Sequence, residues 1–178
     1  PGKTPPLPGL GYGHTMNLIL LEEQDLDPQR DTALVRGRRF EHMVGIQGAS
    51  AGDEVAVGIV GGNLGTGRIA KLERDHLVLE VSIDHPPPSP RKLEVIAALP
   101  RPLILKRLLH GLTTLGVKRI HLIGARKVER SFWNSRALKP EAIREQLILG
   151  LEQARDTRLP EVHLHPYFRP FTEEVLGH

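Results

Sequence analysis

The sequence contains no cysteine, few aromatic residues and no long apolar run. Without cysteine, disulfides, thiolate metal sites and cysteine nucleophiles are all excluded. Aromatic residues make up only 4% of the chain, so a core has to be built from Leu, Ile, Val and Ala. No apolar stretch is long enough to cross a bilayer, and no signal-peptide pattern occurs. These absences predict a soluble, cytoplasmic protein with no membrane partner.

Acidic residues are scarce in one stretch of the chain. Between Arg91 and Lys139 there are twelve Lys or Arg and only two acids, Glu94 and Glu129, which gives this window a net charge of +10. The whole chain carries only +3, so the remaining residues sum to −7. A basic segment beside acidic surroundings favours a surface that binds polyanions, and RNA is the natural candidate.

The first half of the chain shows short strands separated by turn residues. Residues 1–15 are rich in Pro and Gly and precede Met16, so we expect a disordered leader. From 16 to 85, alternating apolar residues and turn signals predict an all-β domain, a small β-barrel with one short helix at 38–44. Its predicted strands cover residues 17–21, 33–35, 54–60, 67–72 and 76–83.

The second half alternates strands with helices. The proline run 86–90 cannot join a helix or a central strand, so it predicts a linker between two domains. Beyond it, residues 91–178 predict an α/β domain with a parallel sheet. The strand at 93–99 is almost continuously apolar, which predicts burial on both faces of that sheet. Further strands are predicted at 117–123 and 162–164, and helices at 102–115, 140–155 and 171–176.

Short fragments in both halves resemble one known family. The first half contributes RFEHMV and AGDEV, which start at Arg39 and Ala51. The second half contributes LPR, LGVKRI, VERS, LEQA and LPEV, which start at Leu99, Leu115, Val128, Leu151 and Leu159. In this order and spacing, the fragments resemble the RsmE family of SPOUT methyltransferases. The resemblance runs from Met16 to the end of the chain.

The resemblance implies a fold, a reaction and partners. The fold is a PUA-like β-barrel followed by a SPOUT domain, an α/β domain that contains a trefoil knot. Members of the family use S-adenosylmethionine to methylate N3 of a uridine in small-subunit (16S) ribosomal RNA, and they act as homodimers. The implied partner is therefore ribosomal RNA or the small ribosomal subunit. The chain departs from the family pattern at Gly48, His110, Thr114 and Asp156, which concerns individual contacts rather than the fold.

Two cofactor-binding segments of the family do not occur in this sequence. Family members bind S-adenosylmethionine through a Gly-Pro-Glu-Gly-Gly-like loop and a later Ile-Leu-Arg-x-Glu-Thr-Ala-like segment, both in the knot. The chain reaches His178 without either of them. We therefore expect a C-terminally truncated member, with only the N-terminal part of the SPOUT domain, no cofactor-binding residues and no activity alone.

Basic side chains supply the candidates for RNA contact. Three of them follow a predicted strand, at the sheet edge where α/β proteins form their sites, and three more lie in or before the helix 102–115. Their alternative explanation is solvated surface charge, which usually mixes both signs. The resemblance adds three from the short helix at 38–44, where the histidine could equally be half-buried and structural. In chain order the candidates are Arg38, Arg39, His42, Arg101, Lys106, Arg107, Arg126, Lys127 and Arg130.

Two further groups have an ordinary structural explanation. His163 and His165 lie on one face of a strand together with Glu161. A metal site needs further ligands and an organising outer shell, so a structural or surface role is favoured and no metal is predicted. Trp133 and its neighbour Phe132 could stack on a base, although packing of their loop onto the domain is favoured.

No catalytic constellation is evident in the sequence. No paired carboxylates and no Ser-His-Asp set have a suitable spacing, and Ser131 has no obvious base partner. The glycine-rich stretch 61–67 lacks the Lys-Ser or Lys-Thr of a phosphate loop, so a hairpin turn is favoured. The leading hypothesis is a methyltransferase of the resembled family. A non-catalytic RNA-binding module derived from it, and a small α/β enzyme for an anionic metabolite, stay open.

Overall fold

The computed structural model describes residues 18–46 and 48–174, except for the side chain of Glu174. The chain forms two compact units. The first runs to Pro87 and also takes in Arg155–Thr157, and the second consists of Pro88–Ala154 and the residues from Arg158 onwards. An all-β unit followed by a parallel α/β unit is the predicted fold class, which is confirmed. The predicted leader, Asn17 at the start of the first predicted strand, and residues beyond 174 lie outside the described residues.

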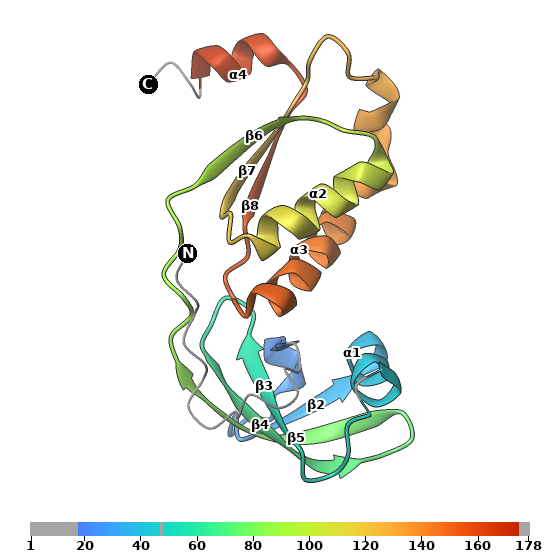
Figure 1. Cartoon of the computed structure of the whole chain (residues 1–178), viewed down its shortest axis with the longest axis vertical. Helices are drawn as coiled ribbons and strands as arrows, with labels where there is room; N and C mark the ends of the chain where they lie inside the picture. Colours follow the sequence, from blue (N-terminus) through green and yellow to red (C-terminus); the bar gives the residue numbers. More distant parts are fainter. Residues whose placement is uncertain (1–17, 47, 175–178) are drawn as a thin grey trace. The chain divides into compact units, whose positions relative to one another are not determined.

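The first unit is a five-stranded sheet that curls into a half-barrel (Figure 1). Its strands occur in the order β1-β3-β4-β5-β2, with β1 parallel to β3 and the other pairs antiparallel. Apolar side chains from each strand fill the concave core, where Val35, Val57 and Leu79 are fully buried. The bounds are Ile19–Leu21 for β1, Thr32–Arg36 for β2, Glu54–Ile59 for β3, Leu64–Leu72 for β4 and His76–His85 for β5.

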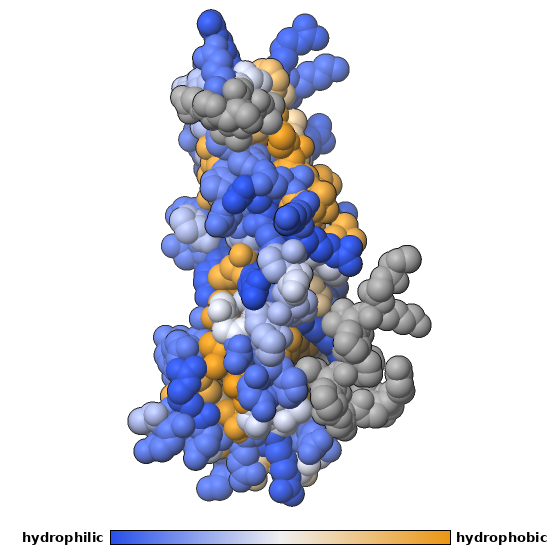
Figure 2. Space-filling view, turned by 90° about the vertical axis from the view of Figure 1, so that its left-hand side faces the viewer, coloured by the Kyte–Doolittle hydropathy of each residue, from blue (hydrophilic) through white to orange (hydrophobic). Residues whose placement is uncertain are grey.

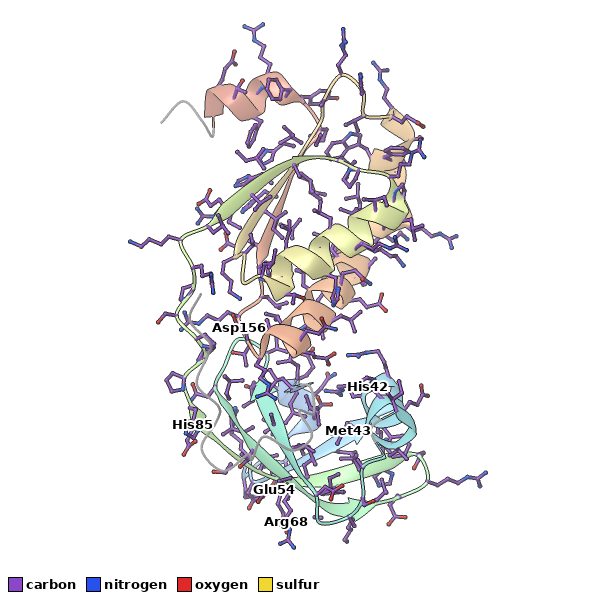
Figure 3. All side chains as sticks on the ribbon, viewed as in Figure 1. His42, Met43, Glu54, Arg68, His85 and Asp156 are labelled. Carbon is purple, nitrogen blue, oxygen red and sulfur yellow. The ribbon has the colours of Figure 1, made fainter. Side chains whose placement is uncertain are left out.

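The short helix of the first unit consists of two kinds of turn. After β2, Gly37 adopts a φ of +59° and begins α1 (Gly37–Glu41), and the chain continues as a π-helical turn over His42–Ile46. Met43 is 1% exposed and packs into the core together with Phe40. Figure 3 shows Met43 and the half-buried His42 on this segment.

The glycine-rich stretch is a turn followed by a strand. The turn ends at Asn63, and β4 begins at Leu64, three residues earlier than predicted, because Gly65 and Gly67 are part of the strand. A Cβ on Gly65 would lie 1.9 Å from the Ser82 carbonyl oxygen, so glycine lets β4 pass close to β5. No helix follows this stretch, which agrees with the hairpin interpretation and not with a phosphate loop. The Gly61 N–H donates to the Thr157 carbonyl, a contact that sequence reasoning missed.

The second unit is a parallel three-stranded sheet in the order β6-β7-β8. Helices α2 and α3 lie side by side on one face of it (Figure 1), so the predicted strand–helix–strand unit is confirmed. Among the described residues, no helix is long and apolar enough to span a membrane. The bounds are Glu94–Ala98 for β6, Pro102–Thr114 for α2, Arg119–Ile123 for β7, Pro140–Ala154 for α3, Glu161–His165 for β8 and Phe168–Glu174 for α4.

Alternate residues of the central strand face two different environments. Ile120 and Leu122 of β7 are fully buried against α2, where Leu105 and Leu109 complete the core. Side chains alternate along a strand, so His121 lies on the opposite face of the sheet. On that face His121 is only 5% exposed, whereas Ile96 of the neighbouring strand β6 is 46% exposed.

The prediction that the strand after the proline run is buried on both faces is wrong. Ile96 in the middle of β6 is 46% exposed, and Glu94 and Ala98 are exposed as well. The reason is that β6 is an edge strand with helices on one face only, whereas the all-apolar pattern is typical of central strands. Figure 2 shows apolar surface among hydrophilic side chains on one side of the molecule.

Candidate functional site

The carboxyl ends of β7 and β8 bring two loops together. Ile123, the last residue of β7, pairs with His165, the last residue of β8. The Gly124 N–H then donates to the His165 carbonyl over 2.7 Å. A Cβ on Gly124 would lie 2.0 Å from the Pro166 carbonyl oxygen, so only glycine permits this approach. The loops leave the sheet side by side, at the edge where α/β proteins place their ligands.

A cavity of about 720 Å³ lies at this edge, within the size range of ligand-binding clefts. One wall is the loop after β7 and the 3₁₀ turn Arg130–Asn134, and the other is the segment that begins α4. We call it the edge pocket. Its charged and aromatic lining residues are Arg126, Arg130, Trp133, Tyr167, Phe168 and Arg169.

The edge pocket combines positive charge with aromatic rings. Arg126 and Arg130 are exposed, and neither has an ion-pair partner within the described part of the chain, whereas Arg169 donates to Glu173 over 2.8 Å. Among the described residues, none of those that line the pocket is an Asp, Glu or His. Guanidinium groups bind phosphates and aromatic rings stack on bases. The lining therefore suits an anionic ligand with a planar ring, such as a nucleotide.

The structure brings some predicted RNA-binding residues together and leaves others apart. Arg126 and Arg130 line the edge pocket, and Lys127 is exposed in the same loop. Lys106 and Arg107 are exposed on α2, whose buried face packs on the sheet; neither lines the pocket. The remaining candidate of this unit, Arg101, is exposed at the N-cap of α2, just after β6 ends.

In the first unit, Arg39 is engaged within the protein. Its guanidinium donates to both carboxylate oxygens of Asp25, at 2.6 and 2.9 Å, and to the Leu20 carbonyl at 2.7 Å. The side chains of Arg39 and Asp25 are only 20% and 11% exposed. This geometry gives Arg39 a structural role, because it ties α1 to β1. Arg38 is exposed and His42 is half-buried on the same segment, and their contact with RNA stays a prediction.

Sequence reasoning missed one wall of the edge pocket. Tyr167, Phe168 and Arg169 follow β8 directly, and Tyr167 and Phe168 are 74% and 54% exposed. The signal that could have identified them is the same one that identified Arg126: aromatic and basic residues immediately after a parallel strand. Trp133 is half-buried, packs against the core with Phe132 and also reaches the pocket, so packing and pocket lining both apply to it.

The predicted pair His163 and His165 is joined by a third histidine, His121 of β7. The His121 ring is stacked near both others, with ring centroids 4.9 Å from His163 and 5.2 Å from His165. Burial and the two neighbouring imidazoles lower the pKa of His121 below the usual histidine value. Within residues 18–46 and 48–174, no group of three or more His, Cys, Asp or Glu side chains is arranged to hold a metal ion.

The half-barrel sheet and the parallel α/β unit with its edge pocket define a class of two-unit protein, an all-β unit followed by an α/β unit with a ligand-sized cavity at the carboxyl edge of its sheet. The family model of the RNA methyltransferase domain matches residues 87–177. The chain is also 31% identical over 166 residues to the ribosomal RNA small subunit methyltransferase E of Treponema pallidum, a match that covers 91% of this chain and 62% of the relative. The chain therefore belongs to the RsmE-type RNA methyltransferase family.

Other relatives agree with this family. The chain is 25% identical over 149 residues to the ribosomal RNA small subunit methyltransferase E 1 of Borreliella burgdorferi, which covers 84% of this chain and 61% of the relative. A crystal structure of the corresponding Neisseria gonorrhoeae protein, bound to S-adenosyl methionine, shares the fold with a TM-score of 0.66 and 17% identity. That match covers 90% of this chain and 65% of the other. The chain thus spans about three fifths of the curated relatives.

Proposed function

We propose that this chain is the RNA-holding part of a small-subunit ribosomal RNA methyltransferase that methylates N3 of a uridine in 16S RNA, in the cytoplasm. The observation that carries the proposal is the edge pocket, where three arginines and three aromatic rings meet at the carboxyl edge of a parallel sheet. The basic surface of α2 extends positive charge beyond the pocket. Membership of the RNA methyltransferase family supports the reaction in this proposal, and the charge and aromatic rings of the pocket support its RNA contact.

The chemistry of the edge pocket accounts for binding and orientation. A guanidinium forms paired hydrogen bonds with phosphate oxygens, and an aromatic ring stacks on a base that has left its helix. Uracil N3 carries a proton at neutral pH, so methylation requires its removal. Within the described part of the chain, the lining contains no carboxylate or imidazole that could accept this proton. Arg126 and Arg130 contribute by stabilising negative charge on the RNA, and we assign no general base.

The proposed methyl donor is S-adenosylmethionine, as in the Neisseria gonorrhoeae structure. Neither of the two cofactor-binding segments of the family occurs in these 178 residues. We infer that RNA binding resides in this sequence and that cofactor binding requires those segments. The homodimer of the family is likewise part of the proposal.

The first test is RNA binding by the edge pocket. Fluorescence anisotropy with a short uridine-containing single-stranded RNA should give a dissociation constant that weakens steeply with salt. Replacing Arg126 and Arg130 together by alanine should weaken binding about tenfold or more, and should reduce the salt slope by about one for each lost phosphate contact. The matched control is Arg136→Ala, since Arg136 is exposed in the same unit but does not line the pocket. Equal affinities for both variants would contradict the proposal.

The second test concerns the cofactor and separates two functions. A non-catalytic RNA-binding module is the second candidate, favoured by the arginines and aromatic rings of the pocket, which can bind RNA without any reaction. Calorimetric titration of the 178-residue chain with S-adenosylmethionine should show no binding. Tight binding would contradict our assignment of cofactor binding to other segments and would favour the enzyme. Binding of uridine monophosphate without affinity for RNA would instead indicate an enzyme for a small anionic metabolite.

A further inference from the structure

We propose that His121, His163 and His165 form a proton-sensitive latch. Through Phe171, which packs on His121 and His165, the latch holds α4, and with it one wall of the edge pocket, against the sheet. The latch would be closed when the three imidazoles are neutral and would open when His121 and His165 both take up a proton. Its effect on RNA binding rests on the proposed function, but the latch itself is a property of the free protein.

The three histidines lie on the face of the sheet opposite α2 and α3. His121 is 5% exposed on the central strand, and His163 and His165 flank it from β8. The rings are nearly parallel, with interplanar angles of 19° and 22° between His121 and its two neighbours. His121 Nδ1 lies 3.0 Å from His165 Nε2, within hydrogen-bond distance. Three ionisable rings therefore share one small volume, in which His121 is buried and His163 and His165 are half-buried.

Helix α4 is attached to this face through one aromatic ring. Phe171 is 2% exposed, and its ring centroid lies 4.7 Å from that of His165 and 5.6 Å from that of His121. The other described side chains of α4 are exposed or half-buried. A seven-residue helix has little stability of its own, so its position depends on this contact.

Proton uptake conflicts with this arrangement. A hydrogen bond between two imidazole nitrogens needs one protonated donor and one bare acceptor, so it is lost when both His121 and His165 are cationic. Two cations about 5 Å apart in a buried site also repel each other. His121 Nε2 is buried without a hydrogen-bond partner among the described residues, and the Glu94 carboxylate lies 3.7 Å from it, so an added proton there gains an electrostatic partner but no hydrogen bond. Charging the cluster therefore weakens the surface on which Phe171 lies.

The surrounding charges offset only part of this cost. From β6, Glu94 Oε2 lies 3.7 Å from His121 Nε2, and from β8, Glu161 Oε2 lies 3.3 Å from His163 Nε2. Both carboxylates also pair with Arg119 of β7. From α4, the charged side chains Arg169 and Glu173 pair with each other at the surface. The carboxylates therefore lie beside His121 and His163, and none of these contacts reaches the His121–His165 hydrogen bond.

The latch is continuous with the edge pocket. His165 ends β8, Phe171 lies within α4, and the pocket residues Tyr167, Phe168 and Arg169 fall between these two anchors. Since the pKa of His121 is lowered, the folded chain binds fewer protons than the unfolded chain as the pH falls below about 6.5. The contribution of the latch to stability is therefore complete above that pH and decreases below it, so acid releases this wall.

The test follows α4 and the pocket in the free 178-residue chain without RNA. Hydrogen exchange and acrylamide quenching of Trp133, the single tryptophan, are measured from about pH 8 to about pH 5. After correction for intrinsic rates, exchange over residues 168–174 should accelerate about tenfold at the acid end while β7 stays protected, and quenching of Trp133 should rise with it. RNA affinity plays no part in this readout, so its failure is distinguishable from failure of the proposed function.

Variants make the test specific. His121→Gln removes the titration but keeps a side chain that can bond His165, so it should abolish the acid transition, whereas His76→Gln in the first unit should leave it unchanged. Phe171→Ala should give fast α4 exchange at every pH. The latch is overturned if exchange of α4 does not depend on pH, if His121→Gln retains the transition, or if β7 loses protection at the same pH as α4.

Discussion

Two groups of arginine differ in their surroundings and therefore in what each side chain can do. Arg39 is largely buried and makes three hydrogen bonds within the protein, two of them to a single carboxylate. Arg126 and Arg130 are exposed at the rim of a cavity. A paired, buried guanidinium stabilises the fold, and an exposed one can bind a phosphate. Residue type alone does not separate these roles.

Replacing Arg39 tests its structural role. Arg39→Ala leaves Asp25 buried without its cation, so we expect the free energy of unfolding to fall by about 3 kcal/mol. Arg30→Ala is the control, because the Arg30–Glu23 pair is more than half exposed and should contribute less than about 1 kcal/mol. Urea denaturation followed by circular dichroism measures both. Equal losses for the two variants would contradict a structural role for Arg39.

At the scale of elements, close contact between α2 and α3 holds the second unit together. A Cβ on Gly150 of α3 would lie 2.6 Å from the Thr113 Cβ and 2.7 Å from the His110 carbonyl oxygen. The Thr113 hydroxyl donates to the Leu109 carbonyl of its own helix, so this buried polar group is satisfied without a partner on α3. The two helices can therefore pack closely at this point, because α3 has no side chain at Gly150 and the Thr113 hydroxyl of α2 is already hydrogen-bonded within its own helix.

A pair of glycine variants tests this close contact between α2 and α3. Gly150→Ala should destabilise the second unit by about 1–3 kcal/mol, because the added methyl group has no space. Gly111→Ala in α2 should be neutral or stabilising by up to about 1 kcal/mol, since no atom lies within 4 Å of the new Cβ and alanine favours helix. Thermal unfolding compares them. A Gly150→Ala protein as stable as the Gly111→Ala protein would show that the helices are not this close.

At the scale of the whole molecule, the second unit leaves apolar side chains on an edge strand. Among the described strands, β6 pairs with β7 alone, and Ile96 on it is 46% exposed. An unpaired strand edge with an apolar side chain favours association with another copy. This exposed edge is a route to self-association that is separate from the proposed homodimer.

Sedimentation velocity over a concentration series tests whether the exposed edge of β6 mediates self-association. The 178-residue chain should self-associate as its concentration rises, and Ile96→Thr should weaken this association several-fold while it keeps a β-branched residue in the strand. Leu103→Gln is the control, because Leu103 is 66% exposed on α2 and away from the strand edge. If Leu103→Gln weakens association and Ile96→Thr does not, the helix surface and not the edge is responsible.

Much of the fold could be predicted because it depends on local patterns. The apolar spacing of 102–115 and 140–155 is set within each helix, and both helices form where expected. Turn residues likewise marked the short strands of the first unit. The edge position of β6 could not be predicted, because an apolar run looks alike in a central strand and in an edge strand. The place of Thr157 in the first unit could not be predicted either. Its carbonyl accepts a hydrogen bond from the Gly61 N–H, and these two residues lie 96 positions apart in the sequence.

By itself, the sequence determined the class of fold, the basic character of the second half and the family, since each depends on residue types, periodicity and ordered motifs. Only the tertiary structure decided which residues form a site. It placed Arg126 beside Tyr167, His121 against His165, and Arg39 on Asp25. These partners lie 14 to 44 residues apart in the chain, and pairing at that range is set by strand register and packing, which no local pattern specifies.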